Sequence, residues 1–239
     1  MRMSHLPTEE RSAAELPAAL AQDIATRLQA AIQARGKALL VVSGGKSPIA
    51  LFEALRILPI AWNQVTVTLA DERCVPNTHA DSNALLVRTH LLKDRAQAAH
   101  LVPMIEDDTP LSTRSSMAAQ ATTRLLALGN ADVLVLGMGT DGHTASLFPE
   151  APNLPLAMDL MQAPSCVPIE LKQPPSNAPY ARISQNLSML LSARHIVLPI
   201  SGKDKLAVLA SAKAQASLAL PVSKLLHQNR TAVTLWLSP

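Results

Sequence analysis

Residues 132–149, with the sequence DVLVLGMGTDGHTASLFP, decide the fold and carry the most informative chemistry. The apolar run at 133–136 does not alternate with polar residues, so it predicts a strand that is buried on both faces. Three glycines follow within six positions, and glycine lets a ligand approach the main chain closely. Asp141 and His143 come with them, and the apolar segment 145–148 could open a helix. This order is typical of an active site at the carboxyl edge of an α/β sheet, although a tight turn with an exposed histidine gives the same pattern.

The rest of the chain alternates between apolar strands and helical segments. This alternation predicts an α/β fold, in which residues 1–239 form a single three-layer αβα domain with a mostly parallel, Rossmann-like sheet. Residues 150–180 are rich in proline and predict an extended excursion over the sheet edge, with a strand near 166–169. Further strands are expected at 38–42, 65–69, 101–105, 196–200 and 232–237, and helices at 17–35, 49–58, 84–92 (capped by Asp81 or Ser82), 112–128 and 205–216.

The composition limits the classes of function. With 48% hydrophobic and 16% charged residues, the chain can bury a sizeable core. The net charge of +3 suits an anionic small molecule, whereas two Phe, two Trp and one Tyr offer little for base stacking, so we expect no nucleic-acid partner. Cys74 and Cys166 show no metal-like spacing, which favours a reducing, cytoplasmic compartment. We expect no membrane segment, because no apolar run reaches about 18 residues, and no signal peptide, because the N-terminus is polar.

Residues 43–48, SGGKSP, lie between a predicted strand and a predicted helix. If Ser47 is the N-cap and Pro48 the first helical residue, free backbone N–H groups point toward the glycine turn. With the helix dipole and a lysine they form a site for an anion such as phosphate. The spacing is not that of a Walker loop, and an ordinary turn with a solvated lysine is the alternative. The candidate binding residues are Ser43, Gly44, Gly45, Lys46 and Ser47.

Residues 70–76, ADERCVP, place three adjacent charges at the end of another strand. Arg73 could clamp a phosphate with two hydrogen bonds, and Asp71 could accept hydrogen bonds from sugar hydroxyls. In the alternative, the segment is a solvated loop in which Asp71 or Glu72 pairs with Arg73. Parallel strands deliver their following loops to one rim, where catalytic groups can converge. The loops expected there are 43–47, 71–73, 137–143 and 201–205.

Six motifs together carry a family resemblance. The chain resembles the glucosamine-6-phosphate isomerase/6-phosphogluconolactonase family, and its lactonases in particular, over roughly residues 15 to 237. Two positions depart from the family pattern: Lys46 stands where Ser is usual, and Thr140 where Pro is frequent. The motifs are SGGKSP at 43–48, ADERCVP at 70–76, HADSN at 79–83, LGMGTDGHTASLFP at 136–149, ARIS at 181–184 and SGKDK at 201–205.

The resemblance implies hydrolysis of 6-phospho-D-glucono-1,5-lactone to 6-phosphogluconate in the oxidative pentose phosphate pathway, without metal or organic cofactor. The expected partner is thus a small phosphorylated sugar lactone, bound by a monomer or weak homo-oligomer. His143 would be the general base, since histidine titrates near neutral pH, and Asp141 would orient its ring. Backbone N–H groups of residues 137–142, which include Gly139, or the Arg73 side chain would stabilise the oxyanion.

The resemblance also assigns the substrate phosphate to a set of cations. It implies that the 43–47 loop, Arg182 and Lys205 hold the phosphate, with Arg73 beside them. Lys205 is preferred to Lys203, because it is the lysine that opens the helix in the family pattern. Holding the phosphate would fix the lactone carbonyl beside the base.

Two other functions stay open. Glucosamine-6-phosphate isomerase/deaminases carry a Glu five residues after the loop histidine, where this chain has Phe148. A non-catalytic sugar-phosphate sensor could dispense with His143 and would usually carry a DNA-binding or partner-binding segment, which we do not recognise here.

Overall fold

The central element of the computed structural model, which describes residues 6–106, 113–171 and 179–239, is a sheet of seven parallel strands. This confirms the predicted α/β fold with a mostly parallel sheet. In spatial order the strands are β1 (Thr8–Glu10), β10 (Ala232–Ser238), β9 (His195–Ser201), β6 (Val133–Val135), β2 (Ala38–Val42), β3 (Val65–Leu69) and β5 (His100–Leu101).

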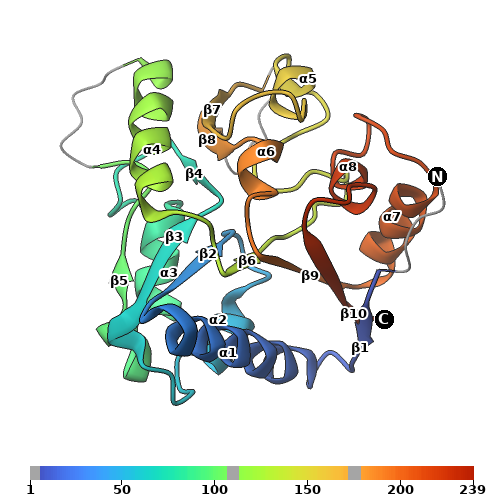
Figure 1. Cartoon of the computed structure of the whole chain (residues 1–239). Helices are drawn as coiled ribbons and strands as arrows, with labels where there is room; N and C mark the ends of the chain where they lie inside the picture. Colours follow the sequence, from blue (N-terminus) through green and yellow to red (C-terminus); the bar gives the residue numbers. More distant parts are fainter. Residues whose placement is uncertain (1–5, 107–112, 172–178) are drawn as a thin grey trace.

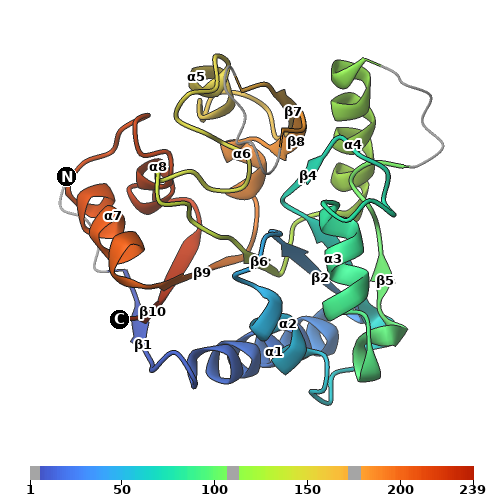
Figure 2. The same cartoon turned by 180° about the vertical axis from the view of Figure 1, so that it is seen from behind.

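Helices cover both faces of this sheet, because the central strands are apolar on both sides. In β2, Leu40 and Val42 pack in one core with α1 (Leu16–Arg35) and α2 (Ile49–Leu55). Leu39 and Val41 pack in the other core. In Figures 1 and 2, α1 and α2 lie below the strands, and α5, α6 and α8 lie above them. The other helices are α3 (Asn83–His90), α4 (Arg114–Leu128), α5 (Leu154–Ala157), α6 (Leu187–Leu190), α7 (Lys203–Ala214) and α8 (Val222–Leu226), with short 3₁₀ turns η1 (Trp62–Gln64) and η2 (Asp94–Ala98).

A second, antiparallel sheet has three strands: β4 (Asp71–Arg73), β8 (Arg182–Gln185) and β7 (Cys166–Ile169). The strand near 166–169 was predicted and is confirmed, whereas residues 71–73 were expected in a loop. The sequence DER does not read as a strand, because a charged residue at its centre is rarely buried. Figure 2 shows this small sheet beside α4 and above β2.

The segment 145–148 does not open a helix, so that expectation was wrong. Ala145 has a left-handed backbone, with φ of 48°, and an isolated bridge joins Thr144 to Leu147. The Ser146 hydroxyl donates to Asp71 Oδ2 at 2.5 Å, which holds the segment across the small sheet instead. Tertiary hydrogen bonding therefore overrides the apolar pattern.

Several element boundaries also differ from expectation. The predicted strand at 101–105 is only His100–Leu101, and the edge strand β1 was missed because its residues are polar. Ser47 is not the N-cap of α2: Pro48 holds that position, and no side chain caps it. Ser82 does cap α3, accepting from the Leu85 N–H at 3.2 Å.

Residues 172–178 of the proline-rich excursion and residue 112 of the predicted helix lie outside the described residues. Over the described part of the chain, no helix has both the length and the apolar character needed to span a membrane.

Candidate active site

A cavity of about 490 Å³ lies at the carboxyl edge of the parallel sheet. Its volume is within the range of small-molecule sites in proteins. The loops after β2 and β6 contribute to it, together with β4, which follows β3, and with the end of β9 and the start of α7. The structure thus brings most of the predicted site residues to one place. Those that line the cavity are Ser43, Gly44, Gly45, Ser47, Asp71, Arg73, Gly139, His143, Arg182 and Lys205.

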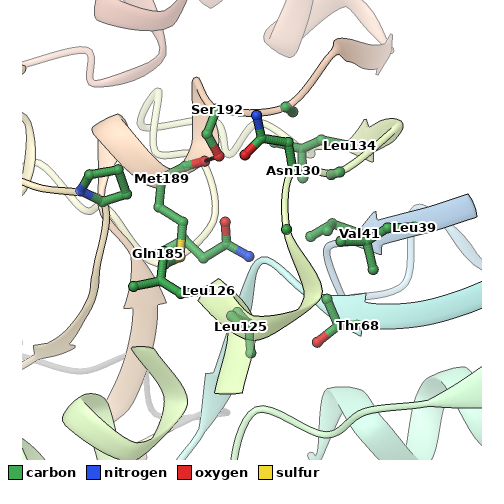
Figure 3. Close-up of a pocket in the computed structure, with 14 residues that line it drawn as sticks. Leu39, Val41, Thr68, Leu125, Leu126, Asn130, Leu134, Gln185, Met189 and Ser192 are labelled. Atoms are coloured by element: carbon green, nitrogen blue, oxygen red, sulfur yellow. Dashed lines mark hydrogen bonds between the residues drawn. The ribbon is translucent and has the colours of Figure 1, made fainter. Parts of the chain in front are cut away.

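A second cavity, of about 80 Å³, lies between the end of α4, α6 and strands β2 and β3. Figure 3 shows its polar side chains, Thr68, Asn130, Gln185 and Ser192, among leucines and Met189. None of its lining residues is charged or a histidine. The larger cavity is therefore the candidate active site.

His143 lines the cavity and pairs with Asp141, which is not among the lining residues. Asp141 Oδ1 lies 2.6 Å from His143 Nδ1 and also accepts from the His143 backbone N–H at 3.1 Å. Burial raises the pKa of the Asp141 carboxyl, but the hydrogen bonds and charge of His143 outweigh this, and the net pKa is lowered. An ionised carboxylate only accepts hydrogen bonds, so Nδ1 carries the proton and Nε2 is the basic nitrogen of the ring.

The glycine turn before this pair has no room for a larger residue at Gly139. A Cβ at Gly139 would lie 2.2 Å from His143 Nδ1 and 2.5 Å from Asp141 Oδ1. The Gly139 N–H donates to the His143 carbonyl, and the Gly142 N–H to the Gly139 carbonyl. These two N–H groups are engaged within the loop, so the candidates for an oxyanion are the other backbone N–H groups of residues 137–142 and the Arg73 side chain.

Two arginines face each other across the small antiparallel sheet. Arg73 in β4 is the register partner of Arg182 in β8. Burial lowers the pKa of Arg182, and the charge of Arg73 adds to this effect while Asp71 opposes it. The Nε atoms of both arginines are buried without a hydrogen-bond partner among the described residues. Like charges directly opposite each other are unfavourable, so this pair is suited to an anion in the cavity.

Glu72 fixes the strand that carries Arg73. Its fully buried carboxylate accepts four hydrogen bonds, from the N–H groups of Arg73, Asn83 and Ala84 and from the Ser82 hydroxyl. Burial raises its pKa, and these hydrogen bonds oppose the rise. Glu72 therefore joins β4 to the N-terminus of α3 rather than pairing with the Arg73 side chain.

The 43–47 loop forms another wall of the cavity. Gly45 has φ of 89°, in the left-handed region that favours glycine. A Cβ at Gly44 would lie 1.8 Å from Asn83 Oδ1, so α3 packs directly against the loop. The Ser43 hydroxyl is buried and has no hydrogen-bond partner within the described part of the chain.

The predicted lysines separate into two groups. Lys205, in the first turn of α7, lines the cavity, whereas Lys203 does not. The helix begins at Lys203, so the argument that Lys205 opens it was wrong, although its position suits the role. Lys46 is exposed and is not among the lining residues, so it does not join the other cations.

Three residues of the site were not predicted as functional. Asn83 lines the cavity and donates to the Asp71 carbonyl at 2.8 Å. Ser146 binds the Asp71 carboxylate, and Phe148 lies against His143. All three lie inside the motifs that carried the family resemblance, but their contacts join segments far apart in the sequence. Among the described residues, no three His, Cys, Asp or Glu side chains gather as a metal ion would require.

Comparison with known proteins gives consistent matches. Residues 11–236 match the family described as "Glucosamine-6-phosphate isomerases/6-phosphogluconolactonase". A Pseudomonas putida protein named 6-phosphogluconolactonase is 46% identical over 92% of this chain and 88% of its own length. A protein of the same name from Neisseria meningitidis serogroup A is 42% identical, over 92% of this chain and 93% of its own. The crystal structure of a 6-phosphogluconolactonase from Shewanella baltica superposes with a TM-score of 0.90 at 37% identity and covers all of both chains. These matches confirm the resemblance that the motifs indicated.

Proposed function

The chain belongs to the glucosamine-6-phosphate isomerase/6-phosphogluconolactonase family, and we propose that it hydrolyses 6-phospho-D-glucono-1,5-lactone to 6-phosphogluconate. It is an enzyme, and proteins named 6-phosphogluconolactonase are among its relatives. The observation that carries this proposal is the shared cavity. His143, which is paired with the Asp141 carboxylate, lines the same 490 Å³ cavity as the cationic side chains of Arg73, Arg182 and Lys205. The substrate has one electrophilic carbonyl and one phosphate, and this cavity offers a partner for each.

His143 acts as the general base in this proposal. With Nδ1–H held by Asp141, the Nε2 atom takes a proton from water while the water oxygen attacks the lactone carbonyl carbon. The negative charge that develops on the carbonyl oxygen is stabilised by backbone N–H groups of residues 137–142 or by Arg73, which lines the cavity and whose buried Nε has no hydrogen-bond partner among the described residues. When the bond from the carbonyl carbon to the ring oxygen breaks, the His143 imidazolium returns the proton to that oxygen. The product is an open chain with a free hydroxyl and a carboxylic acid, which releases its proton to the solvent and becomes a carboxylate.

The phosphate is bound far from the reacting carbon. We assign it to Arg182, Lys205 and the 43–47 loop, where the Ser43 hydroxyl is available as a donor. Asp71, held by Ser146, accepts hydrogen bonds from the sugar hydroxyls. Fixing the phosphate and hydroxyls orients the carbonyl beside His143, so remote binding contributes to the rate.

One assay tests the activity. Freshly generated 6-phosphogluconolactone is mixed with the enzyme, and acid release is timed against spontaneous hydrolysis. We expect release well above the spontaneous rate, with no added metal or cofactor. Ammonia release from glucosamine 6-phosphate, with no lactone hydrolysis, would assign the chain to the other branch of the family. Binding of both compounds without turnover would favour a sensor. The expected pathway, cytoplasmic location and monomeric or weakly associated state stay predictions.

A further inference from the structure

Phe148 contacts two functional residues from different parts of the chain. Its ring centroid lies 4.3 Å from that of the His143 imidazole, with an angle of 36° between the rings. The Arg182 guanidinium carbon lies 5.2 Å from the same ring centroid. Phe148 is 8% exposed and is not among the residues that line the cavity. It therefore lies behind the site, against both the predicted base and a predicted phosphate ligand.

The two contacts have a clear physical basis. Aromatic rings at this separation attract each other, and an arginine is attracted to the negative face of a phenyl ring. A phenyl ring is also rigid, with only two side-chain torsions, so whatever packs against it loses freedom. The contact with Phe148 matters for the Arg182 side chain, because its Nε is buried without a hydrogen-bond partner among the described residues.

The backbone around Phe148 is itself held at several points. Thr144 Oγ1 donates to the Gly137 carbonyl at 2.9 Å, and the Ser146 hydroxyl donates to Asp71. The Phe148 N–H donates to the Ser146 carbonyl at 3.1 Å. The backbone that carries the buried ring is thus held at several points, so the ring can define where its neighbours lie.

We propose that Phe148 is a positioning residue, whose ring sets the distance and orientation between the His143 imidazole and the Arg182 guanidinium. Substrate phosphate on Arg182 would then place the lactone carbonyl at the distance that His143 requires. This inference rests on the proposed lactonase function, since it assigns these two residues to the two ends of that substrate. It goes beyond that function in predicting that an apolar residue outside the cavity controls both kcat and KM.

The test compares two Phe→Leu variants, because the chain has only two phenylalanines. Phe148→Leu removes the shared ring. Phe52→Leu is the matched control: Phe52 is fully buried in α2 and does not line the cavity. At a temperature where both variants are folded, Phe148→Leu should lower kcat on the order of tenfold or more and raise KM several-fold, because a small misplacement of reacting groups is costly. Phe52→Leu should lower Tm and leave kcat and KM within about twofold of the wild type, as a change away from the site would.

Calorimetric binding of 6-phosphogluconate separates this inference from the proposed function. Phe148→Leu should weaken binding several-fold, as Arg182 loses its support, and Phe52→Leu should not. If the wild type binds but does not hydrolyse the lactone, the proposed function fails and this comparison still decides the role of Phe148. If Phe148→Leu does not fold, Phe148→Met removes the ring with a smaller change in volume. The inference is overturned if the ring-free variant binds and turns over like the wild type, or if Phe52→Leu causes the same losses.

Discussion

At the scale of single residues, Gly139 is a position in the site that has no room for a side chain. A Cβ there would lie 2.2 Å from His143 Nδ1, so Gly139→Ala must separate His143 from Asp141. We expect kcat to fall by about 10²-fold, because the base loses its orientation. The matched control is Gly36→Ala, at a left-handed C-cap with φ of 72° and open space around the Cβ. It should lower Tm with little change in kcat, and normal kcat in Gly139→Ala would contradict the assigned pair.

The pH dependence of turnover is also set by this pair. The folded-state pKa of Asp141 is lowered, so its carboxylate stays ionised as the pH falls through its ordinary value and is protonated only at lower pH. Above that lower pH the Asp141 carboxylate keeps its hydrogen bond to His143, so the orientation of the base does not change with pH there. We expect the acid limb of log kcat against pH to have a slope of about one. A slope of two, in a stable enzyme, would show that both members titrate together.

At the residue scale, a contact could be predicted where its two residues lie close together in the sequence. Asp141 and His143 are two positions apart, so their pairing could be inferred from one loop. Arg73 and Arg182 were predicted separately, but their register pairing across β4 and β8 was not. The roles of Asn83, Ser146 and Phe148 depend on contacts with other segments, and no local pattern reveals them.

At the scale of elements, Glu72 is the side chain that joins β4 to α3. Each oxygen of the Glu72 carboxylate accepts two hydrogen bonds. Glu72→Gln replaces one of these oxygens with an NH₂ group, which cannot accept, so at least one buried backbone N–H loses its partner. We expect Glu72→Gln to reduce the free energy of unfolding by about 1–3 kcal/mol, measured by denaturant titration. Glu10→Gln, at the exposed end of β1, should change it by less than about 0.5 kcal/mol. Equal stability of both variants would contradict this role.

Element prediction succeeded for strands with apolar runs and failed where tertiary contacts decide. The strands β2, β6 and β9 are apolar and buried, and their positions follow from composition alone. β4 contains three charged residues, and its strand conformation depends on pairing with β8, more than a hundred residues away. Segment 145–148 has helical composition but is held by the hydrogen bond from Ser146 to Asp71.

At the scale of the whole molecule, the order of elements and the shared rim were predictable. Alternating strands and helices require a parallel sheet, and a parallel sheet requires that the loops after its strands share an edge. The cavity at that edge draws on residues that follow β2, β3 and β6 and on the junction of β9 and α7, as expected, although residues 71–73 form a strand rather than a loop. The small antiparallel sheet was not predictable, since it combines short strands from separate parts of the chain: β4, β8 and, from the proline-rich region, β7. That the whole chain forms a single domain stays a prediction.

Ligand binding should stabilise the whole molecule. At a concentration near 100 times its Kd, 6-phosphogluconate adds about 2.7 kcal/mol, which for a chain of this size raises Tm by roughly 5–10 °C. Arg182→Ala should remove most of this rise, because Arg182 is a proposed phosphate ligand. Arg230→Ala, at an exposed arginine outside the cavity, should keep it. An undiminished rise in Arg182→Ala would contradict the phosphate assignment.

The most direct test of the account is steady-state hydrolysis of 6-phosphogluconolactone by His143→Ala, with 6-phosphogluconate binding measured on the same protein. If an imidazole base and a set of cations act at two ends of one cavity, kcat falls on the order of 10²-fold or more, while product binding stays close to that of the wild type. A folded His143→Ala variant with near-normal kcat would contradict the account.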